Sequence, residues 1–231
     1  MKINTNISSL TAQEAAKNTN NSISSSLEKL STGLKINKAS DDASGLAIAD
    51  KLRTQVTSIN QGISNGNSAV ALLQIADKSM AEQSKILDTI KSKLIQANTD
   101  TTSADGRTAI AKDVTKLLEQ LNNIAKQTNY NGTNLLQAAA TSTATKTALS
   151  FQIGENPSDM IETAAIQANT LGYGLDTLSA AAGTGASAAA GASVFTRAQA
   201  TAGQTAVDTA ITKLNGYRGD IGSTQNQVES A

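Results

Sequence analysis

The sequence predicts a mainly α-helical fold, in which long antiparallel helical rods form a coiled-coil or bundle core beside a small β-containing variable insert. Apolar residues recur at steps of three and four along most of the chain, as on one stripe of a helix. Proline occurs once in 231 residues, so few helices are interrupted. Residues are 39% hydrophobic but only 2% aromatic, which favours a slender body packed by Ala and Leu over a thick globular core.

The first helical unit is predicted in residues 1–42. Ile23, Leu27, Leu30 and Leu34 follow steps of 4, 3 and 4 and form one apolar stripe that requires a partner helix, so we interpret them as an assembly stripe. Residues 36–42 are rich in turn formers and helix-capping residues and predict a joint between two helices. A pair of adjacent carboxylates in this joint, at positions 41 and 42, is interpreted as a helix cap rather than a metal site.

The core rod is predicted in residues 43–137. Residues 43–96 form one long helix, weakened locally by Gly62 and Gly66, and about 80 Å long at 1.5 Å per residue. A polar link, with Ser103 or Asp105 as the cap, leads into an antiparallel second helix whose apolar stripe runs from Ile110 to Ile124. The Tyr-Asn-Gly-Thr-Asn segment at residues 130–134 predicts a stop and a turn.

Residues 138–201 are predicted to form a variable, irregular region with β-structure near residues 148–153. Within it, the Ala-, Gly- and Ser-rich residues 179–193 are expected to be flexible and to form no core. Residues 202–231 return to a heptad stripe and complete the core rod. The stripe is still running at Ala231 without a stop signal, which we interpret as a cut inside a longer helix.

The composition argues against several classes of function. Lys+Arg and Asp+Glu both number 19, with no charged run, so nucleic acid is not an expected partner. Neither a membrane span nor a cleaved secretory signal is predicted. Cysteine and histidine are absent, which removes thiolate sites, the common nucleophile pairs and most zinc chemistry. We therefore expect no enzyme, no metal and no cofactor.

Several segments resemble bacterial flagellins. Residues 1–7 (MKINTNI), 27–37 (LEKLSTGLKIN) and 41–49 (DDASGLAIA) are similar to the N-terminal region of that family. The resemblance extends to residues 151–154 (FQIG), and residues 217–226 (YRGDIGSTQN) resemble the helix by which the flagellin C-terminus re-enters the bundle.

The resemblance implies a structural subunit of the flagellar filament, which polymerises into the helical propeller and has other flagellin subunits as partners. It also implies export by the flagellar type III apparatus with a chaperone, and an extracellular location in the filament. In flagellins the first helix pairs with a last C-terminal helix, before which this chain is expected to stop. The alternative is a hook-filament junction protein, which cellular copy number would distinguish.

The resemblance also concerns the segment where enterobacterial-type flagellins engage a Toll-like receptor. Its equivalents here are Asp88, Thr89, Ile90, Lys93, Ile95 and Gln96. Receptor-recognised flagellins carry a Gln-Arg pair and a Leu where this chain has Asp88, Thr89 and Lys93. A carboxylate and an ammonium at those places imply weak or no receptor engagement, as in flagellins of the Campylobacter, Helicobacter and Arcobacter group.

Overall fold

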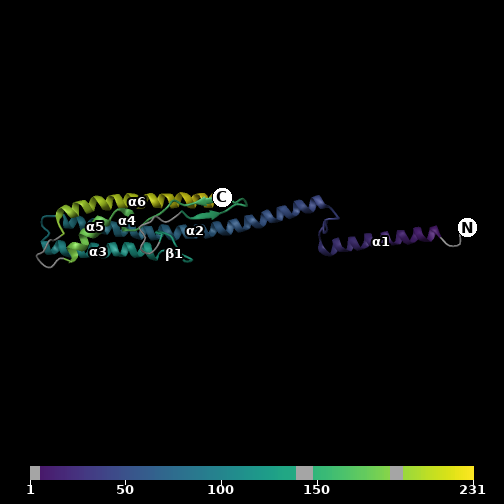
Figure 1. Cartoon of the computed structure of the whole chain (residues 1–231), viewed down its shortest axis with the longest axis horizontal. Helices are drawn as coiled ribbons and strands as arrows, with labels where there is room; N and C mark the ends of the chain where they lie inside the picture. Colours follow the sequence, from purple (N-terminus) through teal and green to yellow (C-terminus); the bar gives the residue numbers. More distant parts are fainter. Residues whose placement is uncertain (1–5, 139–147, 188–194) are drawn as a thin grey trace. The chain divides into compact units, whose positions relative to one another are not determined.

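The computed structural model describes residues 6–138, 148–187 and 195–231, and its helices and strands are labelled in Figure 1. The chain divides into two compact units, Met1–Ser58 and Ile59–Ala231. Long helices dominate both units, and among the described residues the strands form two small antiparallel pairs. The prediction of a mainly α fold with a small β-containing part is therefore confirmed.

The first unit contains helix α1 (Ile7–Thr32) and the beginning of α2 (Ala43–Ala97). The Asn6 side chain caps α1 by accepting a hydrogen bond from the Ser9 N–H at 3.3 Å. Gly33 ends α1 in a left-handed conformation, with φ at 72°. The prediction that Leu34 continues the helical stripe is wrong, because Leu34 lies beyond this turn.

The joint between α1 and α2 is held by carboxylates, as predicted. Asp42 caps α2, its Oδ1 accepting a hydrogen bond from the Gly45 N–H at 2.9 Å. Asp41 Oδ2 accepts hydrogen bonds from the N–H groups of Asn37 and Lys38, both at 3.2 Å. These bonds favour the charged carboxylate and lower the pKa of Asp41.

The second unit contains the rest of α2 with α3 (Ala104–Gln127) and α6 (Arg197–Ser230), which run beside it in Figure 1. The single helix predicted for residues 43–96 is confirmed, and of the two candidate caps for α3 Ser103 is the actual one. Ion pairs join Lys93 of α2 to Asp113 of α3 at 2.8 Å, and Lys91 of α2 to Asp208 of α6 at 2.5 Å. Helix α6 begins five residues earlier than the predicted boundary at 202, at a capping box formed by Thr196 and Gln199.

Between these long helices lie α4 (Thr170–Tyr173) and α5 (Asp176–Ser187). The prediction that residues 179–193 form no core is wrong for residues 179–187. Those residues belong to α5, which packs against α3 and α6 and buries Leu178 and Ala182. The remaining residues of that stretch, 188–193, lie outside the described part of the chain.

Two β-hairpins complete the second unit. Strands β1 (Asn129–Tyr130) and β2 (Thr133–Asn134) pair across the predicted turn, while β3 (Ser150–Gln152) pairs with β4 (Met160–Glu162). The β3–β4 hairpin lies so close to α2 that a Cβ at Gly62 would stand 1.9 Å from the Ile153 carbonyl oxygen. Gly62 is thus required for close approach.

A buried polar side chain, Gln83 of α2, connects the elements of the second unit. Its Nε2 donates to the carbonyl oxygens of Leu121 at 3.2 Å and Ala168 at 2.8 Å. Its Oε1 accepts from the Tyr173 hydroxyl at 2.8 Å, and both Gln83 and Tyr173 are fully buried. Burial raises the pKa of the Tyr173 phenol. The amide of Gln83 and the hydroxyl of Tyr173 therefore both have hydrogen-bond partners inside the core.

Candidate assembly surfaces

Helix α1 carries a long apolar stripe that nothing within its unit covers. None of its 26 residues is buried. Leu30 is 81% exposed, and Leu27 and Ile23 are also more than half exposed. An apolar side chain gains stability only when it leaves water, so burial of this stripe would be favourable.

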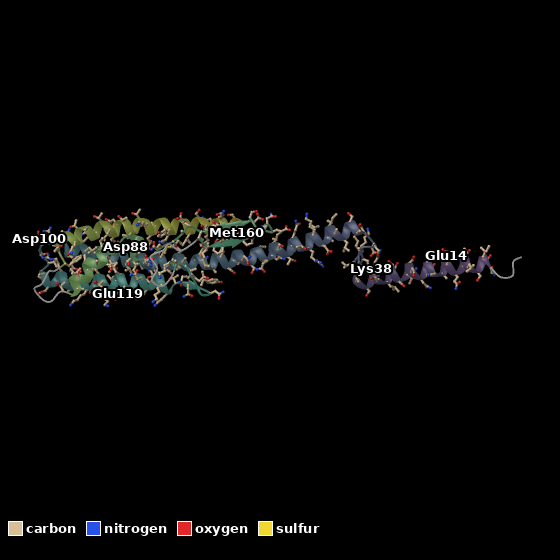
Figure 2. The ribbon with its side chains drawn as sticks, in the orientation of Figure 1. Glu14, Lys38, Asp88, Asp100, Glu119 and Met160 are labelled. Carbon is tan, nitrogen blue, oxygen red and sulfur yellow. The ribbon has the colours of Figure 1, made fainter. Side chains whose placement is uncertain are left out.

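The stripe on α1 is longer than its large residues indicated. At about 100° per residue, Ala12, Ala16 and Thr19 lie on the same side as Ile23 and Leu30, within an arc of about 80°. Charged residues occupy the opposite side, among them Glu14, which Figure 2 labels. The small residues were missed because alanine and threonine are weak signals in a search for large apolar side chains.

The beginning of α2 carries a second stripe of the same kind. In the first unit it consists of Ile48, Leu52 and Val56, which are between 55 and 59% exposed. In the second unit Ile59 and Ile63 follow at the same helical spacing and are 53 and 58% exposed. The five residues have the spacing of a core helix but lack its burial.

Further along α2 most apolar side chains are covered, although Ile75 and Ile95 stay 40 and 53% exposed. A Cβ at Gly66 would lie 3.7 Å from Val228 near the end of α6. Arg218 of α6 donates to Asp77 of α2 at 2.8 Å. This contact follows Gly66 along α2 and precedes Val228 along α6, as expected for antiparallel helices. From Leu73 onward the core side chains of α2 are buried. The exposed stripe ends at Ile63, so it lies before the α6 contact at Gly66 and overlaps in sequence with the hairpin contact at Gly62.

The receptor-segment residues do not form one surface. Asp88, labelled in Figure 2, shares a side of α2 with Ile95, which is 53% exposed. Thr89, Lys93 and Gln96 lie on the neighbouring side. Lys93 is paired with Asp113, whereas the Thr89 hydroxyl donates to the Lys85 carbonyl. The remaining residue, Ile90, is fully buried in the core and cannot touch a partner.

The described residues contain neither a candidate metal site nor a candidate membrane span. No group of three or more His, Cys, Asp or Glu side chains gathers in them where a metal ion could bind. In the same ranges, no helix is both long and apolar enough to cross a bilayer.

Comparison with known sequences gives one family. The model of the bacterial flagellin N-terminal helical region matches residues 3–141. Flagellin B of Helicobacter pylori is 46% identical over 166 residues, which are 69% of this chain and 32% of that protein. The flagellar filament 33 kDa core protein of Treponema phagedenis is 34% identical over 99% of this chain and 79% of its own length. The chain spans about a third of the length of the Helicobacter relatives it matches.

Solved structures give similar folds. The flagellin of Bacillus cereus superposes with a TM-score of 0.55 at 27% identity, covering 72% of this chain and 85% of that one. A putative flagellar hook-associated protein from Vibrio parahaemolyticus superposes with a TM-score of 0.64, covering 83% of this chain and 91% of that one. Its sequence is 14% identical, so this likeness concerns the fold alone.

Proposed function

Because the chain belongs to the bacterial flagellin family, we propose that it is a structural subunit of the flagellar filament and polymerises with copies of itself into a helical propeller. The observation that carries this proposal is the pair of uncovered apolar stripes on α1 and the beginning of α2. A monomer that exposes them loses the stability their burial would give, whereas a filament can cover them.

The size of this gain supports assembly. On the α2 stripe alone, five large apolar side chains are more than half exposed. Covering such a side chain stabilises a complex by about 1 kcal/mol or more, so this one stripe offers several kcal/mol before the cost of ordering. The α2 stripe therefore contributes part of the free energy that association requires, and the α1 stripe adds to it.

We propose that different parts of the chain have different places in the filament. In this proposal residues 1–42 belong to the inner tube, residues 43–137 and 202–231 form the core rod, and residues 138–201 form the variable region. The start of α6 at Arg197 extends the core rod slightly into the variable region. The α2 stripe would take an antiparallel helix, the orientation in which α6 already packs on the same helix.

The test is complementation of a bacterium that lacks its own filament gene, with filaments counted by negative-stain electron microscopy and swimming scored in soft agar. A variant with Ile23, Leu27 and Leu30 changed to Ser should make no filament. A matched variant with Glu14, Lys17 and Asn21 changed to Ser, on the other side of α1, should make filaments. Normal filaments from the stripe variant would refute the role of α1, and none from the unchanged chain would refute the function.

The hook-filament junction remains the alternative. The Vibrio hook-associated structure shares the fold only, whereas the family model and the Treponema filament protein favour a filament subunit. Quantitative mass spectrometry of whole cells separates the two, because a filament contains thousands of subunits and a junction only a ring. Copy numbers near those of the hook proteins would favour the junction.

The route and location follow from the same proposal. We propose export through the flagellar type III apparatus with a chaperone, followed by assembly outside the cell. Filaments sheared from intact cells should then contain the protein. Its retention inside cells that have a working export apparatus would contradict this route.

We also propose that receptor engagement is weak or absent. By the resemblance, receptor-recognised flagellins carry other side chains at the positions of Asp88 and Lys93. Here Asp88 is an acidic residue and Lys93 is paired with Asp113, and desolvating these charges opposes binding. Intact protein should barely activate a cell reporter of the Toll-like receptor. The triple variant Asp88→Gln, Thr89→Arg and Lys93→Leu should activate the reporter more strongly. Strong activation by the unchanged chain would contradict the proposal.

A further inference from the structure

The chain contains three Asn-Gly dipeptides, which the fold places in three different environments. They are Asn65-Gly66 in α2, Asn131-Gly132 between β1 and β2, and Asn215-Gly216 in α6. Asn-Gly is the dipeptide in which the backbone nitrogen of the second residue meets the least steric hindrance near the side-chain amide of the first, because glycine has no Cβ. Whether this nitrogen can react depends on the structure around it.

We propose that Asn131-Gly132 is a site of spontaneous deamidation in the folded protein, and that the other two dipeptides are protected. In this reaction the Gly132 nitrogen loses its proton to solvent base and attacks the Asn131 side-chain carbon. Ammonia leaves and a five-membered succinimide forms. Water then opens either carbonyl–nitrogen bond, which yields aspartate or isoaspartate at position 131.

The β1–β2 turn exposes the reacting groups. Asn131 and Gly132 both have positive φ angles, 49° and 78°, as in the two-residue turns that close hairpins. Both residues are exposed to solvent, and the paired strands end at Tyr130 and Thr133. Among the described residues, no hydrogen bond engages the Asn131 side chain or the Gly132 N–H. Water and base therefore reach the site without any opening of the fold.

The two helical dipeptides lack this access. Inside a helix the glycine N–H is donated to the carbonyl four residues earlier, so its nitrogen reacts only after local opening. Asn65 is held further, since its Nδ2 donates to the Gln152 carbonyl at 3.0 Å and its Oδ1 accepts from Gln61 at 2.9 Å. Asn215 is exposed and has helical protection only. We therefore expect the order Asn131, then Asn215, then Asn65.

Isoaspartate would change the hairpin beyond adding a charge. It inserts one more backbone atom into a two-residue turn, whose length sets the Tyr130–Thr133 register. Leu135 and Leu136 are buried directly after β2, but their backbone contacts are made to Thr128 and Ala168. The product should thus lose the β1–β2 pairing and keep the core.

The experiment is incubation of the full chain at mildly alkaline pH in water enriched in the heavy oxygen isotope, followed by peptide mass mapping and isoaspartyl methyltransferase labelling. Asn131 should react at least about tenfold faster than either helical site, the factor expected if their opening costs about 1.4 kcal/mol or more. In concentrated urea the three sites should react at similar rates.

Two variants complete the design. Asn131→Gly keeps a residue that tolerates positive φ and removes the reactive amide, so it should abolish the isoaspartyl methyltransferase labelling at position 131. Asn131→Asp adds the charge with a normal backbone and separates its effect from that of isoaspartate. Equal or faster reaction at Asn65 or Asn215 in the folded protein would overturn the proposal. The proposal would also be overturned if none of the three sites reacted in the folded protein while all three reacted in urea.

Discussion

Gln83 offers a direct test of how the second unit is held together, because one side chain bonds to α3, to α4 and to the loop before α4. In the variant Gln83→Leu, the Tyr173 hydroxyl loses its acceptor and the carbonyl of Ala168 loses a donor, both within the core. A buried polar group left without a partner costs about 1–3 kcal/mol, and the added apolar contact of Leu offsets part of this cost. We expect the free energy of unfolding to fall by about 2–4 kcal/mol in urea denaturation followed by circular dichroism.

The control for this measurement is Gln120→Leu, the same change at an exposed position of α3. It should alter the free energy of unfolding by about 0.5 kcal/mol or less. A double-mutant cycle with Tyr173→Phe isolates the side-chain pair and should give a coupling of about 1–2 kcal/mol. If Gln83→Leu were no more destabilising than Gln120→Leu, the buried network would not stabilise the fold.

The remaining predictions concern glycine packing and alkaline stability. Gly62→Ala should lower the melting temperature and cost more than about 1 kcal/mol, because its Cβ would collide with the Ile153 carbonyl. Gly66→Ala should be neutral or stabilising by up to about 1 kcal/mol, because its Cβ would make an ordinary contact with Val228; a larger loss at this site would contradict the packing. The raised pKa of Tyr173 means that its contribution is fully present below about pH 10 and is lost at higher pH, since the unfolded chain then releases a proton that the folded chain keeps. Tyr173→Phe should therefore lose less stability between neutral and alkaline pH than the unchanged chain, as measured by urea denaturation across that range.

The long helices were predictable because each carries its own local signals. The start of α3 has a Ser cap, and its apolar residues follow strict 4 and 3 steps through Ile124. The turn between β1 and β2 was predictable for the same reason, since Asn-Gly matches a two-residue hairpin. These features depend on neighbours in sequence, which a single chain displays.

Helix α5 was not predictable from its own residues. Its sequence is mostly Ala, Gly and Ser, which by composition is also typical of a flexible linker. It is ordered by contacts that are distant in sequence: a Cβ at Gly185 would lie 3.0 Å from Phe195 and 3.4 Å from Ala111 of α3. Small residues are what such close helix packing needs, so the composition that suggested flexibility instead allows a tight interface.

The placement of Leu34 shows a different limit. Periodicity alone puts it on the α1 stripe, but Gly33 ends the helix before it. Glycine followed by a leucine can continue a helix at a modest cost or stop it with a left-handed turn, and the side-chain bonds of the joint favour the second outcome. Here the Thr32 hydroxyl accepts hydrogen bonds from the Leu34 N–H and the Asn37 side chain.

The two stretches of α2 explain why assembly surfaces are harder to predict than folds. Ile59 and Leu73 belong to the same helix and follow the same kind of spacing, yet one is 53% exposed and the other 1%. Hydrophobic periodicity predicts that one face of a helix will be buried, but it does not predict whether the residues that bury it belong to the same molecule. That distinction requires the contacts themselves: Val228 and Ile153 lie close to Gly66 and Gly62, whereas the side chains of the stripe from Ile48 to Ile63 stay more than half exposed among the described residues. An apolar stripe with core-like spacing but no intramolecular cover is therefore where a filament subunit is expected to bind its partners.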